Sequence, residues 1–142
     1  MFNIGLVNRN ATLPTPHWNS DGSYTIPLLA IGGELAVAAA TANQPLTAAA
    51  PAAQYAYITN IYVIVTATAA AAASFSLLDA TSGNVLHKFS YNAAGPTLHD
   101  KVTFRFEIPH RTAALAGQFF VTTTGAGITY SVQCNGFFTS LL

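Results

Sequence analysis

The chain has 142 residues, which suits one domain that buries about two thirds of its unfolded surface. Charged residues are 7% of it, against about 25% in an ordinary soluble domain, and five basic residues balance five acidic ones. No basic patch for a nucleic-acid backbone, no apolar run of ~18 residues for a membrane span and no signal-peptide pattern is found. The low charge and 51% hydrophobic content favour lasting contact with other subunits.

The first part of the chain, residues 1–53, is expected to be an extended arm with one or two edge strands and a linker rich in Ala and Pro. Phe2–Val7 fits a short strand or an arm that adds to a neighbour's sheet. Pro14 and Pro16 favour extended backbone. Trp18, in a polar loop, is either an anchor in a partner's pocket or a lid over the domain's own core. The candidate partner contacts are Phe2, Ile4, Leu6 and Trp18.

Further along this part, the pattern alternates between turns and short strands. Asn19–Gly22 predicts a turn, and Ser23–Leu29 predicts a strand that Pro27 moves to a sheet edge. Gly32–Gly33 is expected to break the chain before extended structure resumes at Glu34–Ala38. Ala39–Ala53 has low complexity, and its prolines argue against a long helix, so a loop or linker is expected.

The second part, residues 54–142, is expected to be the β-sandwich itself. It begins with Gln54–Thr66, the longest β-prone run, which has apolar residues on both faces. This predicts a central strand that is covered twice, or covered once and in contact with another subunit. One predicted face holds Tyr55, Tyr57, Ile61, Val63 and Val65, and the other holds Ile58, Tyr62 and Ile64.

A hairpin is predicted next. Ala73–Leu78 and Val85–Tyr91 are its strands, and Asp79–Asn84 is its turn. Phe75 and Leu77 are expected to point inward. The segment Asn92–Asp100 reads as a loop.

Strict alternation marks Lys101–Ile108, KVTFRFEI, as a strand with one face in the core. Pro109 is expected to end it. Gly117–Thr124 and Ile128–Asn135 are the next strands, joined by a tight connection at Gly125–Gly127. The residues predicted to point inward are Val102, Phe104, Phe106, Ile108, Phe119, Val121, Ile128, Tyr130, Val132 and Cys134.

These elements predict an all-β protein, an antiparallel jelly-roll-like β-sandwich with an extended N-terminal arm. Six strands fall in residues 54–138, and residues 23–38 add two, which gives eight strands in two packed sheets. Cys134, the single cysteine, excludes an intrachain disulfide and is expected to be a small buried hydrophobe.

No residue pattern indicates catalysis, a metal or a cofactor, so none of the three is expected. The four histidines lie at no compact metal-binding spacing; His87, His99 and Asp100 are the nearest to a strand-built site, and ordinary solvated roles suit them better. No GxSxG elbow or phosphate-binding glycine loop is present. Asp79 fits a turn and Glu107 a solvent face, not a glycosidase pair.

The order of segments in residues 54–138 resembles the decoration or cement proteins of tailed bacteriophages, small β-sandwich proteins of the virion. A Tyr-rich entry strand, YAYITNIYVIV, precedes an Ala/Thr linker, TATAAAAA. A hairpin around a small turn, FSLLDATSGNVL, and a terminal hairpin, GQFFVTTTGAGITYSVQCNGF, follow. Phage neck, tail and fibre proteins share this order.

The resemblance implies a structural virion protein that binds the outer surface of the phage head and stabilises contacts between capsomers. Its implied partners are the major capsid protein and itself, as a homo-oligomer with a trimer favoured; nucleic acid and membrane are not among them. Synthesis in the host cytoplasm and location on the capsid surface are expected. The alternative is a receptor- or carbohydrate-binding module of a phage tail or fibre, with Trp18, Tyr91 and His99 as candidate contacts.

Overall fold

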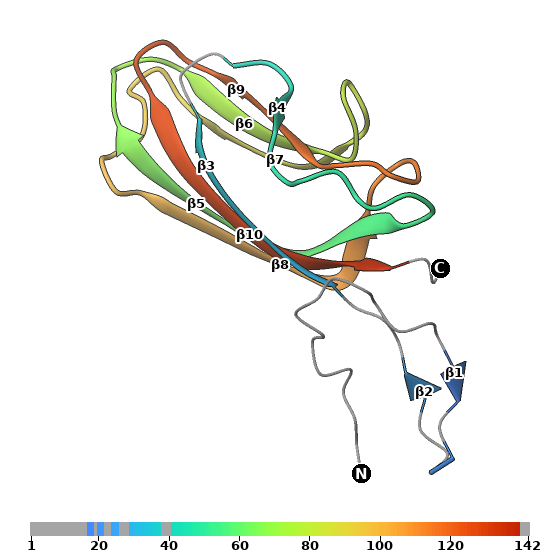
Figure 1. Cartoon of the computed structure of the whole chain (residues 1–142). Helices are drawn as coiled ribbons and strands as arrows, with labels where there is room; N and C mark the ends of the chain where they lie inside the picture. The colour runs from blue at the N-terminus through green and yellow to red at the C-terminus, as the bar shows by residue number, and fades with distance from the viewer. Residues whose placement is uncertain (1–16, 19, 22–23, 26–28, 38–40, 140–142) are drawn as a thin grey trace.

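Figure 1 shows a computed structural model of the chain, which describes residues 17–18, 20–21, 24–25, 29–37 and 41–139. Before residue 35, side chains are described only at Ser20 and Asp21. Within the described residues the chain forms ten strands and no helix. The strands are β1 (His17–Trp18), β2 (Tyr24–Thr25), β3 (Leu29–Val37), β4 (Gln44–Pro45), β5 (Tyr55–Ala67), β6 (Ala73–Leu78), β7 (Val85–Tyr91), β8 (Lys101–Arg111), β9 (Phe120–Thr124) and β10 (Thr129–Thr139).

Eight of these strands form two four-stranded antiparallel sheets that face each other. Their orders are β3-β10-β5-β8 and β4-β9-β6-β7. β1 and β2 form a separate two-stranded hairpin, which stands away from both sheets in Figure 1. The predicted all-β class, the antiparallel pairing and the two-sheet arrangement are therefore confirmed.

The pairing is nested along the chain. β3 pairs with β10, β4 with β9, β5 with β8 and β6 with β7. Two further pairings, β10 with β5 and β9 with β6, join these pairs into the two sheets. The last four strands of the two sheets thus pair, in reverse order, with the first four.

The core lies between the sheets and is built from the inward residues of alternating strands. The inward positions predicted in β6, β9 and β10 are buried, and Cys134 is buried as expected. β5 lies between β10 and β8, which confirms it as a central strand. The largest completely buried side chains are Tyr130, Phe75, Phe119, Ile58, Ile61, Leu77, Ile128, Val37, Val63, Val65, Val121 and Val132.

A bulge of several residues in β8 overturns the prediction that Ile108 points inward. Asn60 of β5 pairs with Arg105, and Ile58 pairs with His110, so two steps along β5 face five steps along β8. The extra residues leave the ladder, and Ile108 is 80% exposed rather than inward. The strand also continues through Pro109 to Arg111 instead of ending, because a bulge removes the need for a backbone donor at that point.

A second irregularity, in β5, changes the predicted faces of that strand. Ile58 pairs with Gly136 and Asn60 pairs with Asn135, so β5 has one extra residue at this point. The extra residue reverses the alternation, because side chains alternate with a period of two. Ile58 is therefore buried on the side of Ile61, whereas Tyr57, predicted on the side of Ile61, faces outward; Tyr55 is likewise only partly buried.

Three predictions for the N-terminal part also need correction. Gly32–Gly33 does not break the chain, since both glycines pair with β10 inside β3. Trp18 lies in a strand, paired with Tyr24, rather than in a loop. Ala39–Ala53 contains β4, and Leu46 and Ala50 in it are buried in the sandwich's own core.

The boundary between residues 1–53 and 54–142 stays a prediction. β3 and β4, which precede it, are edge strands of the two sheets. Of the candidate partner contacts, Phe2, Ile4 and Leu6 lie outside the described residues, as does the side chain of Trp18.

Candidate functional site

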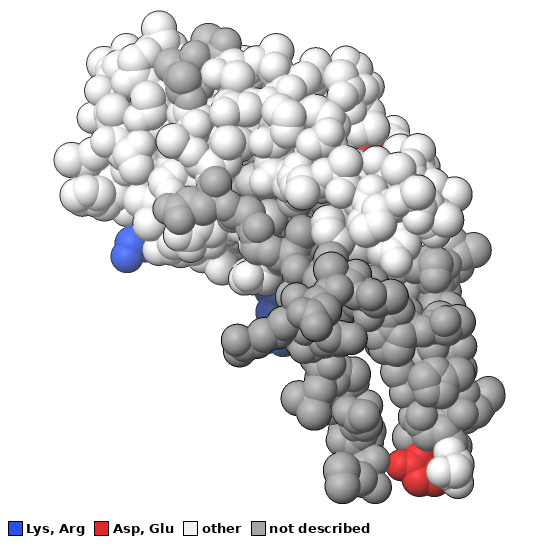
Figure 2. All heavy atoms as spheres, viewed as in Figure 1, with Lys and Arg blue, Asp and Glu red and all other residues white. Residues whose placement is uncertain are grey.

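The outer faces of the two sheets differ in chemistry. On the β3-β10-β5-β8 sheet, the outward residues of β5 and β10 include half-buried aromatic rings, and Tyr57 stacks on Phe137 with centroids 5.0 Å apart. Hydroxyl and amide side chains surround these rings. The outward residues of the other sheet are instead mostly small and hydroxyl-bearing, and include Ser74, Ser90, Thr122 and Thr124. Figure 2 shows one face of the molecule, on which few charged side chains reach the surface.

One end of the sandwich gathers exposed apolar residues. We call it the arm end; it holds the starts of β3, β5, β7 and β9 and the ends of β6, β8 and β10. Two hydrogen bonds tie its loops across the sheets: Ala113 N donates to Asp79 O (3.1 Å) and Ala116 N donates to Gln54 O (2.8 Å).

Three of the four exposed large hydrophobic residues in the described part of the chain lie toward the arm end. Ile108 is 80% exposed, Val85 54% and Leu115 50%. The fourth, Leu98, is 49% exposed and lies in the loop before β8, at the opposite end. These three side chains are therefore available for contact with a partner at this end of the sandwich.

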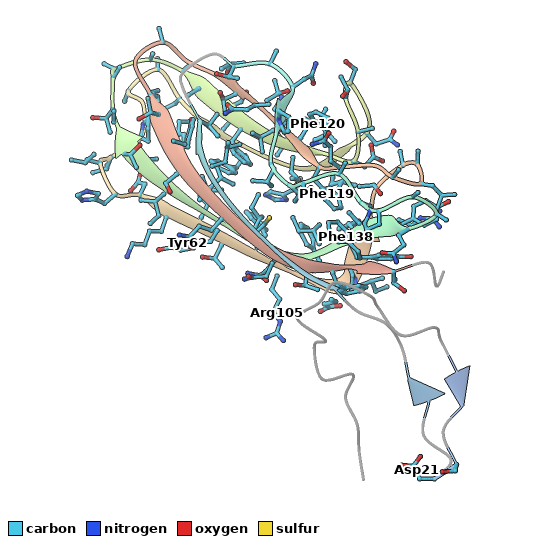
Figure 3. The ribbon with its side chains drawn as sticks, viewed as in Figure 1. Asp21, Tyr62, Arg105, Phe119, Phe120 and Phe138 are labelled. Carbon is cyan, nitrogen blue, oxygen red and sulfur yellow. The ribbon has the colours of Figure 1, made fainter. Side chains whose placement is uncertain are left out.

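A hollow opens beside the bulge of β8, on the outer side of the β3-β10-β5-β8 sheet. The bulge separates the two strands locally, because residues 106–109 lie outside the ladder. In Figure 3, Arg105 and Tyr62 point away from the sandwich on this side, whereas Phe119 lies between the sheets. The hollow is lined by Thr59, Asn60, Thr103, Arg105, Phe106, Glu107 and Pro109.

Residues of opposite charge line the hollow. Arg105 and Glu107 are both exposed, and neither is in an ion pair within the described residues. The Thr59 hydroxyl, which has one proton to donate, lies within hydrogen-bond distance of Asn60 Oδ1 (3.2 Å) and of the Asn135 carbonyl oxygen (3.0 Å). Neither contact uses the Asn60 amide nitrogen, which stays available as a donor. The hollow thus offers donors and acceptors with no net charge.

Polar atoms are also buried inside the sandwich without a partner in the described structure, namely Tyr130 Oη, His87 Nε2 and Gln54 Oε1. Burial, with a smaller contribution from Tyr91, raises the pKa of Tyr130 to about 12. Burial lowers the pKa of His87, whose ring lies 3.4 Å from that of Phe104 between centroids. Burial therefore favours the neutral form of both side chains, and charging either of them should lower the stability of the fold.

Of the sequence candidates for ligand binding, the side chains of Tyr91 and His99 are described and that of Trp18 is not. Tyr91 is half-buried, with its ring edge-on to Phe89. His99 is exposed in the loop before β8, with φ of 67°. No group of three His, Cys, Asp or Glu side chains gathers as metal ligands in the described ranges, so His87, His99 and Asp100 form no such set.

Arg105, Glu107 and Asn60 were not predicted as site residues. Regular alternation placed Arg105 and Glu107 on an ordinary solvated face of a strand. The signal that marks the bulge is Pro109, since a proline within a strand occurs at edges and bulges. The prediction that Pro109 ends the strand left no place for the bulge or for the hollow beside it.

None of the described residues belongs to a helix long and apolar enough to cross a membrane. No protein-family model, curated protein or solved structure matches the chain.

Proposed function

We propose that this chain is a structural virion protein, a decoration or cement protein that binds the outer surface of a phage head and stabilises contacts between capsomers. In this proposal its partners are the major capsid protein and further copies of itself, with a trimer favoured. The arm end faces the shell, and the N-terminal arm extends from it.

The nested strand order supports a jelly roll as the finer description of the sandwich. In a jelly roll a long antiparallel ribbon is wound so that first and last strands pair in one sheet and the next strands inward pair in the other. The pairings β3–β10 and β5–β8 in one sheet, with β4–β9 and β6–β7 in the other, follow this scheme. Viral capsid and lectin domains both use this fold.

The observation that carries the proposal is the apolar arm end. Ile108, Val85 and Leu115 lie toward the end at which the chain enters β3 at Leu29. Apolar side chains and an arm that arrive at one end favour end-on docking, because both then bury surface against the same partner. A charge content of 7% supports a lasting contact, since few charges need to be desolvated.

The test compares two leucines of equal exposure at opposite ends. Leu115 is 50% exposed and Leu98 is 49% exposed, so Leu115→Asp and Leu98→Asp place the same charge in similar surroundings. The variants are added to particles stripped of this protein, and bound protein is measured by sedimentation. We expect Leu115→Asp to weaken binding about tenfold, as for a buried interface residue, and Leu98→Asp to bind like the unchanged chain. Equal binding by both variants would refute end-on docking.

The copy number in purified particles tests the role itself. Quantitative mass spectrometry against the major shell protein should give a ratio near one to one for a cement protein. A ratio of a few per hundred would place the protein in a neck, tail or fibre. Deleting residues 1–20 should weaken particle binding while the sandwich keeps its melting temperature, which separates a docking arm from a folding element.

A further inference from the structure

We propose that the hollow beside the β8 bulge is a binding site for a neutral oligosaccharide. The proposal does not rest on a role in the virion. The hollow borders the proposed docking surface, because Ile108 lies between Glu107 and Pro109, which line the hollow. The hollow joins outward side chains of β5 and β8 with the residues that the bulge displaces.

The first argument is the balance of hydrogen-bonding groups. Arg105 has only donors, Glu107 has only acceptors when ionised, and the Asn60 amide nitrogen adds a further donor. A ligand that satisfies all three must both accept and donate within a short distance, and must itself be neutral. Vicinal hydroxyl groups of a pyranose meet these conditions, since each hydroxyl both donates and accepts.

The second argument is the apolar part of the lining. Phe106 and Pro109 line the same hollow, and both are half-buried. Phe106 packs against the core of the sandwich, and its ring is edge-on to His110, with centroids 4.6 Å apart and planes at 87°. The parts of Phe106 and Pro109 that stay accessible give the hollow an apolar side for the C–H face of a sugar, whose hydroxyls then meet the polar groups.

The third argument is the rigid placement of the polar groups. Asn60 and Arg105 are paired residues on adjacent strands. Groups on strands keep their spacing better than groups on loops, which lowers the entropy lost on binding. The bulge also disfavours the main competing ligand, an added peptide strand, because the displaced residues 106–109 interrupt the regular edge that such a strand needs.

The experiment is a titration of the ¹⁵N-labelled full-length chain, followed by amide chemical shifts. The probes are maltohexaose, cellopentaose, mannohexaose and galactotetraose, each at about 10 mM, with tetra-alanine as the peptide probe. An open site with few contacts is expected to bind with a Kd on the order of 1 mM. At least one sugar should shift the amides of Thr59, Asn60, Arg105 and Phe106, and tetra-alanine should not.

Three variants on one strand test the chemistry. Arg105→Ala and Glu107→Ala should each weaken sugar binding about tenfold, the effect of losing a hydrogen bond to a charged group. Lys101→Ala removes an exposed charge from the same strand outside the hollow and should leave the affinity unchanged. The proposal would be overturned if none of the sugars shifts the amides at the hollow, or if only tetra-alanine shifts them. Equal sugar affinities for all three variants would also overturn it. Particle binding by Arg105→Ala is measured in parallel, so a failure here is distinct from a failure of end-on docking.

Discussion

The Tyr130 hydroxyl provides a mutation that should stabilise the protein. Tyr130 is completely buried, its ring packs edge-on to Phe75 with centroids 5.8 Å apart, and its Oη has no hydrogen-bond partner in the described structure. A buried polar group without a partner costs about 1–3 kcal/mol. Tyr130→Phe removes the hydroxyl and keeps the ring. We therefore expect the free energy of unfolding to rise by about 1–3 kcal/mol.

Thermal unfolding followed by circular dichroism measures this effect. For a chain of this size, 1 kcal/mol corresponds to a shift of about 3–4 °C, so the melting temperature should rise by about 3–12 °C. Tyr62→Phe is the control, since Tyr62 is half-exposed on the outer face and its loss of a hydroxyl should change stability by less than about 0.5 kcal/mol. A Tyr130→Phe protein that melts at or below the temperature of the unchanged chain would show that the hydroxyl has a stabilising partner.

Alkaline pH gives a second measure of the same group. The pKa of Tyr130 is raised to about 12 from an ordinary value of 10.0, so the folded state favours the neutral phenol. The associated stability is fully present below pH 10 and is lost as the pH rises through about 12. Tyr130→Phe should therefore lose less stability between pH 9 and pH 11 than the unchanged chain does.

Three further changes test other parts of the fold. Burial lowers the pKa of His87 below 6.5, so the stability gained by keeping its ring neutral is present above pH 6.5 and is lost as the pH falls. His87→Leu should therefore reduce the decrease in melting temperature between pH 7.5 and pH 5. His99→Asn, the control, should leave that decrease unchanged. Gly136→Ala should destabilise the fold by about 2 kcal/mol or more, because a Cβ there collides with the Tyr57 carbonyl group, whereas Ser131→Ala on the same strand should change stability little. Leu77→Ala should cost about 2–5 kcal/mol in urea unfolding, since Leu77 is completely buried; a loss below 1 kcal/mol would contradict the described core.

Where alternation is regular, the sequence predicted the sandwich well. β6 and β7 begin and end at the expected residues, and Ile128, Tyr130, Val132 and Cys134 are buried as expected. Such strands are predictable because most of their inward residues are apolar and most of their outward residues are polar. The turn residues between β6 and β7 likewise made their hairpin predictable.

The bulges could not be read from alternation. One extra residue in β5 places Tyr57 outward, and the extra residues in β8 expose Ile108. A bulge changes which face every later residue occupies, yet it needs no change in composition. The candidate hollow depends on these two irregularities together, so its residues come from local backbone geometry and not from a sequence motif.

The short strand β4 was missed for a different reason. Gln44–Pro45 lies in an Ala- and Pro-rich stretch with no strand propensity, and it joins a sheet through its pairing with β9 and through the burial of Leu46 and Ala50. Its structure is imposed by tertiary packing, which a local reading does not detect.

The nested strand pairing has a consequence for the time at which the protein can fold. The central hairpin β6–β7 joins neighbouring strands and can form early, whereas β3 must wait for β10, whose last paired residues include Phe138. During synthesis, the edges of β3 and β5 that pair with β10 therefore stay uncovered until β10 has left the ribosome. Folding dominated by such distant contacts is slow, on the order of milliseconds to seconds. Chains truncated before β10 should accordingly aggregate or require a chaperone, and only full-length chains should assemble.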